Sequence, residues 1–208
     1  MFIHGGEWVL GGFDTHERLV RELANNANAA IVFVNYTPSP EVKYPVSLEQ
    51  VYTASKWVAE NGQAIHIDSS RLTVVGDSVG GNMAAAFTLL AQERRGLSIR
   101  LSTFLSVTDA SFDTSSYMKY QEGYWLTREA MKWFWSNYIS DQTNRKEPKV
   151  SPLQVSLDQL KGCRRHLSSM EKMTYCATKA KPMPVSYWRL AYALLQSDIM
   201  VPSTTLEC

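Results

Sequence analysis

The chain alternates short unbroken apolar runs with longer segments whose apolar residues recur every three or four positions. Unbroken runs of this kind are typical of parallel strands buried on both faces. They lie at residues 30–36, 72–75 and 99–107. The segments with helical spacing lie at residues 15–26, 46–60, 79–94 and 127–139. This repeated strand and helix order predicts an α/β fold, with a mostly parallel sheet and helices on both faces.

One strand-to-helix junction suggests chemistry. Ser78 lies between Gly76 and Gly80, after an apolar strand and before an alanine-rich helix. This context is typical of a nucleophile elbow, in which a tight turn exposes a serine hydroxyl at the helix N-terminus. The alternative is an ordinary glycine-containing turn with an incidental serine. A phosphate-binding loop is disfavoured, because no Gly-Lys-Ser/Thr sequence follows.

A second glycine motif near the start of the chain fits the same chemistry. His4-Gly5-Gly6 follows a short apolar segment and offers backbone N–H groups without side chains. Such a loop, together with the N–H of Val79 after the serine, would stabilise the oxyanion formed in acyl transfer. We expect His4 itself to be a structural residue that holds this loop by hydrogen bonds.

Composition narrows the class of partner. The 208 residues carry a formal net charge of +1, and 45% of them are hydrophobic. This balance gives no electrostatic footprint for nucleic acid or an anionic membrane, so we expect a small-molecule partner. No segment has the length of a membrane span and no secretory signal is recognisable, which predicts a cytoplasmic protein. The three cysteines, Cys163, Cys176 and Cys208, match no metal site or disulfide framework.

Several separate motifs resemble those of the hormone-sensitive lipase branch of the α/β-hydrolases, a group that includes microbial and fungal esterases. They are His4-Gly5-Gly6, Asn35-Tyr36 with Pro38, Pro40, Glu41 and Tyr44-Pro45, Gly76–Asn82, Val107–Ala110 and Ser151–Leu153. The resemblance covers residues 1–162. It implies an α/β-hydrolase fold and a carboxylesterase acting on small esters without metal or organic cofactor. It assigns Ser78 as nucleophile, with Gly5, Gly6 and Val79 as oxyanion donors.

Three departures from that family pattern stand out. Glu7 replaces a third glycine, and its carboxylate would obstruct the acyl pocket or repel the oxyanion. The strands and helical cap that precede this loop in the family are absent, so we expect a fold that is incomplete at its start. After Gly162 the family's acidic and histidine motifs are also missing, so we expect it to be incomplete at its end as well.

The missing motifs reappear in another reading frame. Shifting the reading frame by one nucleotide after Gly162 permits an amino-acid sequence that contains DVLRDEG and IHDF. These two segments match the family's acid and histidine motifs. At six residues the codons allow only one amino acid in the shifted frame. These amino acids are Gly, Asp, Leu, Ala, Leu and Gly, and each agrees with the family-like sequence. The six residues are Met170, Met173, Tyr175, Met183, Tyr187 and Met200. We therefore expect two parts, a partial hydrolase core at 1–162 and an out-of-frame tail at 163–208.

The sequence consequently assigns no residue as the general base for Ser78 or as the acidic partner of that base. His166 is the one histidine after Ser78, and Asp109 follows a predicted strand, so these two are the stand-in candidates. We expect His16 and His66 to be surface or helix-flanking residues. Two alternatives to an active esterase remain, a non-catalytic protein that binds a small ligand and a truncated inactive product. The sequence does not fix an oligomeric state.

Overall fold

The computed structural model describes residues 1–97, 99–104, 106–156, 159 and 166–169. Within them, five strands form one parallel sheet in the order β2-β1-β3-β4-β5. The strands are β1 (Phe2–Ile3), β2 (Phe33–Val34), β3 (Thr73–Asp77), β4 (Arg100–Phe104) and β5 (His166–Ser169). The predicted parallel sheet is therefore confirmed.

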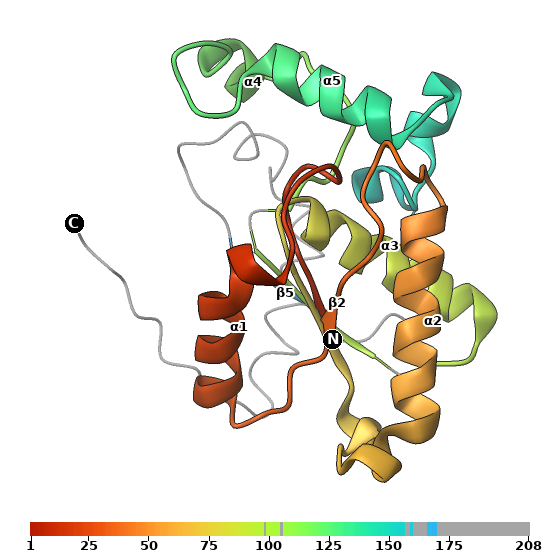
Figure 1. Ribbon diagram of the computed structural model, residues 1–208. Coiled ribbons are helices and arrows are strands. Elements are labelled where there is room, and N and C mark those ends of the chain that lie inside the picture. Colours follow the sequence, from red (N-terminus) through yellow and green to blue (C-terminus); the bar gives the residue numbers. More distant parts are fainter. Residues whose placement is uncertain (98, 105, 157–158, 160–165, 170–208) are drawn as a thin grey trace.

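Helices lie on both faces of the sheet, as predicted. They are α1 (Phe13–Ala27), α2 (Val46–Asn61), α3 (Val79–Arg94), α4 (Ser115–Lys119) and α5 (Arg128–Tyr138). In Figure 1, α1 lies on one side of the strands, α2 and α3 lie on the other, and α4 and α5 lie at one end of the molecule. Short 3₁₀ turns follow α2, precede β3 and connect α5 to the tail, at Gly62–Ile65, Ser69–Arg71, Gln142–Lys146 and Pro152–Gln154.

Helix α3 packs so closely on the sheet that two positions admit only glycine. A Cβ atom on Gly80 would collide with the backbone carbonyl of Ile3, and one on Gly76 would collide with the backbone of Gly80. The alanine-rich face of α3, with Met83 and Phe87 fully buried, completes the packing. This close approach places the β3–α3 turn beside the segment that follows β1.

The helix boundaries agree with the expected ranges at some ends and differ at others. Helix α1 begins at Phe13, before the expected start at residue 15, and the Gly12 N–H donates to Thr15 Oγ1 at 3.0 Å at this start. Helix α3 ends at Arg94, as the expected range 79–94 has it, and Arg95 follows in the left-handed conformation (φ 51°). The short helix α4 after β4 has no counterpart among the expected ranges.

The expected strand at 30–36 is also reduced, to the two residues of β2. Among the described residues β2 lies at the edge of the sheet and pairs with β1 alone. Ile31, Val32 and Phe33 are consequently only half-buried, where the apolar run predicted complete burial. An apolar run identifies a strand but does not reveal whether both of its sides find partners.

Two motifs that are far apart in the sequence meet behind α3. The Leu153 N–H donates to the Thr108 carbonyl at 2.9 Å, and the Ala110 N–H donates to Ser151 Oγ at 3.0 Å. The buried Asn82 side chain donates to the carbonyls of Val107 and Val150, both at 2.8 Å. These bonds fix the helix that follows Ser78 against the segments after β4.

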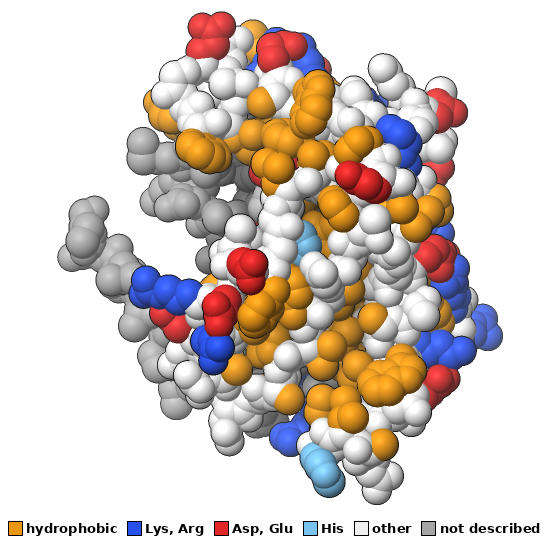
Figure 2. Space-filling model, in the orientation of Figure 1, with side chains coloured by type: hydrophobic (Ala, Val, Ile, Leu, Met, Phe, Trp, Pro, Cys, Tyr) orange, Lys and Arg blue, Asp and Glu red, His pale blue; other side chains and the backbone are white. Residues whose placement is uncertain are grey.

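The remaining expectations concern the tail and the surface. The proposed boundary at 162/163 lies outside the described residues, and of the tail only β5 is described. No helix in the described ranges has the length and apolar character needed to cross a bilayer. Figure 2 shows hydrophobic side chains gathered over the end that carries α4 and α5. The exposed large ones in that part of the chain are Met118, Tyr124, Trp125 and Trp133.

Candidate active site

Ser78 connects the end of β3 to the start of α3 in a conformation that is unusual for a residue with a side chain. Its φ is 51° and its ψ is −120°, and the serine is half-buried. The Ser78 carbonyl accepts hydrogen bonds from the N–H groups of Asn82 and Val107, both at 3.2 Å. A left-handed φ in a non-glycine residue costs on the order of 1 kcal/mol or more, and functional sites are where such strain is usually found. The surrounding glycine contacts keep this turn tight.

The loop after β1 runs beside this turn and is itself strained. Gly6 (φ 110°), Glu7 (φ 51°) and Trp8 (φ 62°) all have positive φ, and a Cβ on Gly6 would collide with the Leu10 carbonyl. The Gly6 carbonyl accepts from the N–H groups of Val9 and Leu10, at 3.0 and 2.7 Å. Within the described residues no acceptor faces the N–H of Gly6 or of Glu7.

The geometry corrects the expectation for Gly5. Its N–H donates to Asp77 Oδ1 at 3.0 Å, so this amide is already engaged and is not free to bind an oxyanion. A Cβ on Gly5 would collide with the same carboxylate, which explains why glycine is required there. The Val79 N–H begins α3, where an amide lacks an intrahelical partner. The amides beside the turn that remain without a described acceptor are thus those of Gly6, Glu7 and Val79.

His4 holds the loop, as the sequence predicted. Its Nδ1 lies 2.7 Å from the Gly5 carbonyl, and the Tyr36 hydroxyl donates to the His4 carbonyl at 3.0 Å. The His4 ring stacks on Tyr36 with centroids 4.2 Å apart and on Phe33 at 5.4 Å. Burial lowers the pKa of His4, and the hydrogen bond to Gly5 only partly opposes that shift. The His4 imidazole, neutral and buried between aromatic neighbours, therefore has a structural role.

Trp8, at the far end of the glycine loop, packs against α5. Trp8 is completely buried and stacks on Tyr138 with centroids 4.4 Å apart, while Trp135 tilts against it at the same distance. On the aromatic face of α5, Trp135 and Tyr138 are fully buried, whereas Trp133 is 55% exposed. The loop is thus fixed at one end by β3 and at the other by α5.

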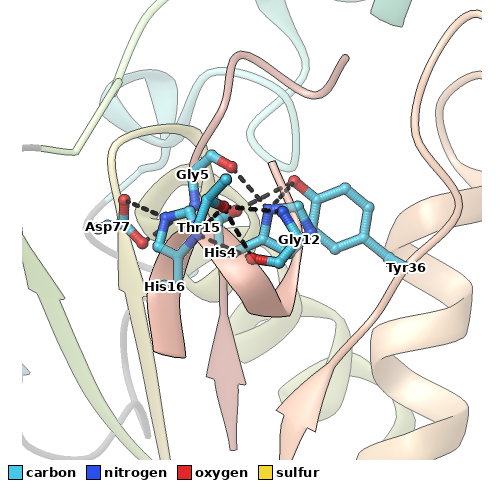
Figure 3. Close-up of polar contacts among 7 residues, drawn as sticks. All are labelled: His4, Gly5, Gly12, Thr15, His16, Tyr36 and Asp77. Atoms are coloured by element: carbon cyan, nitrogen blue, oxygen red, sulfur yellow. Dashed lines mark hydrogen bonds and ion pairs between the residues drawn. The ribbon is translucent and has the colours of Figure 1, made fainter. Parts of the chain in front are cut away.

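His16 is the residue that the sequence reasoning underrated. It lies on the first turn of α1 with its Nε2 3.4 Å from Asp77 Oδ2, and its side chain is only 15% exposed (Figure 3). It is therefore part of the polar cluster beside Ser78 and not a surface residue. His66, in contrast, is exposed as expected. A helix-start histidine carries no signal that would identify a contact with residue 77, because the contact depends on the placement of α1.

Glu7 contributes a second carboxyl to this region. Burial raises its pKa, and the negative charge of Asp77 raises it further. No described residue forms a hydrogen bond or ion pair with the Glu7 side chain. Among the described residues, no cluster of three His, Cys, Asp or Glu side chains is arranged to hold a metal ion.

The two stand-in candidates for base and acid lie elsewhere. His166 begins β5 and pairs with Leu101, which in turn pairs with Val74, four positions before Ser78. At about 3.3 Å per residue along a strand, the His166 backbone is roughly 13 Å from Ser78 in that direction alone, beyond the reach of an imidazole. Asp109 accepts from Ser111 Oγ at 2.5 Å and from Gln154 Nε2 at 3.2 Å. In the described part of the chain, no side chain hydrogen-bonds to Ser78 Oγ.

Known proteins provide an independent comparison. A family profile described as alpha/beta hydrolase fold matches residues 1–197. An ethyl acetate hydrolase of Pseudomonas putida is 36% identical over 155 residues, which are 74% of this chain and 49% of that protein. Carboxylesterase NlhH of Mycobacterium tuberculosis is 42% identical over 96 residues, 46% of this chain and 30% of that protein. These relatives match the group indicated by the motifs.

A solved structure gives the same result for the fold. A thermostable esterase from Pseudomonas putida ECU1011 superposes with a TM-score of 0.85 and 44% sequence identity. The superposition covers 93% of this chain and 60% of that one. The chain spans about half the length of the curated relatives it matches.

Proposed function

The chain belongs to the alpha/beta hydrolase family, and on this premise we propose that its chemistry is the hydrolysis of small carboxylic esters with Ser78 as nucleophile. The observation that carries the proposal is the left-handed Ser78 at the β3–α3 turn, beside a loop with two unengaged amides. The esterases among the relatives support the reaction class.

The proposed reaction follows from what these groups do. Ser78 Oγ attacks the ester carbonyl carbon while a base accepts the hydroxyl proton. The negative charge that develops on the carbonyl oxygen is stabilised by the N–H groups of Gly6, Glu7 and Val79. Collapse of this intermediate expels the alcohol with the returned proton and leaves an acyl-serine. Water then attacks the acyl-serine and releases the acid.

Among the described residues, neither candidate for the general base is placed to accept the proton of Ser78. His166 is too far from Ser78 along the sheet, and Asp109 is engaged with Ser111 and Gln154. We propose that residues 163–208 are out of frame, and that the alternative frame encodes the acid and the histidine. The stretch His166-Leu167-Ser168-Ser169 supports this, because a strand paired within a parallel sheet is normally apolar. The alternative frame encodes Ala-Leu-Val-Ile at these positions.

An esterase assay tests the function. We expect p-nitrophenyl acetate and butyrate to be hydrolysed by the chain, and the Ser78→Ala variant to abolish that turnover. Ser136→Ala, an exposed serine on α5, is the matched control and should leave turnover unchanged. Ester binding without turnover would identify a non-catalytic binding protein, and aggregation of the purified chain would identify an inactive product. Either result contradicts an active esterase.

Sequencing the transcript across the Gly162 codon tests the frame. We expect an alternative frame that encodes both the acid and the histidine motif. Expressing that version should raise turnover by roughly a hundredfold or more, because a triad contributes far more than oxyanion donors alone. A transcript in which no frame encodes both motifs would end the frame proposal while leaving the Ser78 assay valid.

A further inference from the structure

Asp77, the residue before Ser78, faces two different elements with its two carboxylate oxygens. Oδ1 accepts the Gly5 N–H at 3.0 Å, and Oδ2 lies 3.4 Å from His16 Nε2 (Figure 3). The side chain of Asp77 is 22% exposed, so water screens this charge only partly. One carboxylate therefore links the strand that carries Ser78, the glycine loop and the first turn of α1.

The imidazole of His16 is fixed at its other nitrogen as well. Nδ1 lies 2.8 Å from Thr15 Oγ1 and 3.2 Å from the Gly12 carbonyl, at the start of α1. Nε2 is the ring nitrogen that faces Asp77, and a carboxylate only accepts hydrogen bonds, so the contact is favourable when Nε2 carries the N–H. The contacts at Nδ1 and the contact at Nε2 lie on different sides of the ring, and together they favour the orientation that faces Asp77.

The other titratable groups around Asp77 are His4, Glu7 and Tyr36. Burial lowers the pKa of His4 and raises the pKa values of Glu7 and Tyr36, and the charge of Asp77 adds an upward shift to all three. Glu7 and Tyr36 are acids and add no positive charge, while the enclosed His4 is disfavoured as a cation. Within the described residues, His16 is the basic side chain that lies against Asp77 Oδ2.

Resting on the proposed function, we propose that His16 is a positioning residue for the oxyanion loop. It holds Asp77 Oδ2, so that Oδ1 stays on the Gly5 N–H, and the Gly5 amide in turn keeps Gly6 and Glu7 beside Ser78. Without His16, the Asp77 side chain has no second restraint among the described residues, and rotation about its side-chain bonds releases Gly5.

Two substitutions at position 16 separate positioning from packing. His16→Phe keeps an aromatic ring among Phe2, His4 and Phe33 but removes both nitrogens. His16→Gln offers an N–H donor where Nε2 lies. His66→Gln changes an exposed histidine outside the cluster and is the control. Asp77→Asn, which keeps an oxygen acceptor for Gly5, is compared with Asp77→Ala, which removes it.

Amide hydrogen exchange by NMR gives a readout that does not depend on turnover. We expect the Gly5 amide to exchange about tenfold faster in His16→Phe and Asp77→Ala, because a charge-assisted hydrogen bond is lost. His16→Gln and Asp77→Asn should retain most of the protection, and His66→Gln all of it. The Val75 amide, which donates to Met1 within the sheet, reports global opening.

Two results would overturn the proposal. One is a Gly5 exchange rate in His16→Phe equal to that of the unmodified chain. The other is an equal acceleration at Gly5 and Val75, which would show a general loss of stability. If the unmodified chain lacks Ser78-dependent turnover, the proposed function fails but the exchange result still decides this inference. Where turnover is present, His16→Phe should lower kcat about tenfold with little change in KM, and His16→Gln should restore it.

Discussion

Tyr36 and Tyr138 are two buried phenols with opposite hydrogen-bonding states. The Tyr36 hydroxyl donates to the His4 carbonyl at 3.0 Å, whereas the Tyr138 hydroxyl has no partner among the described residues. Tyr36→Phe should therefore lower the free energy of unfolding by about 1 to 2 kcal/mol, because it leaves a buried carbonyl unpaired. Tyr138→Phe should be neutral or stabilising by up to about 1 kcal/mol. Urea denaturation measures both, and equal losses would contradict the assignment.

Glu7 makes stability depend on pH in a defined direction. Burial and the charge of Asp77 raise its folded-state pKa above the ordinary value of 4.5, so the folded chain binds the proton more tightly than the unfolded chain. Its contribution to stability is complete below pH 4.5 and is lost as the pH rises through the raised pKa. Glu7→Gln should remove this loss and be more stable than the unmodified chain at neutral pH.

Urea midpoints measured between pH 4 and pH 8 check this expectation. Glu122→Gln removes the same charge from an exposed loop position and serves as the control. A Glu7→Gln variant whose midpoints follow those of the unmodified chain at every pH would show that Glu7 does not titrate differently on folding.

At the scale of elements, the fit of α3 against β1 is decided at Gly80. Alanine normally stabilises a helix by about 1 kcal/mol relative to glycine. At Gly80, however, a Cβ would meet the Ile3 carbonyl, so Gly80→Ala should destabilise by roughly 3 kcal/mol through overpacking. Gly12→Ala, where a Cβ meets nothing within 4 Å, should be close to neutral. Thermal unfolding compares the two, and a stabilised Gly80→Ala variant would contradict the close packing.

The elements show how far sequence reasoning reaches. The order of strands and helices and the turn at Ser78 follow from residues that are neighbours in the chain, and the alternation of strands with helices indicates a parallel sheet. The contact of His16 with Asp77 and the engagement of the Gly5 amide depend on how α1 and β1 are placed in space. The proposed oxyanion donors therefore differ from the expected ones, since Gly5 is already engaged and the sequence indicated Glu7 only as an obstruction.

At the scale of the whole molecule, the described part of the sheet has an apolar edge strand, β2. Among the described residues β2 pairs on one side only, and Ile31 and Val32 are half-buried. An unprotected apolar edge favours pairing with another chain. We expect the protein to associate as its concentration rises, and Ile31→Lys to reduce that association. Trp57→Lys, at a 52% exposed position on α2, is the control, and light scattering distinguishes them.

The burial of Trp8 between Trp135 and Tyr138 has a consequence for biosynthesis. Trp8 leaves the ribosome before the two rings that enclose it, which emerge only after β1, β2, β3 and β4 have been translated. In the nascent chain, the Trp8 indole therefore stays uncovered until α5 has been translated. Chaperones that bind exposed aromatic residues have their longest opportunity at this point, and a chain that ends before α5 would lack the support that fixes the glycine loop.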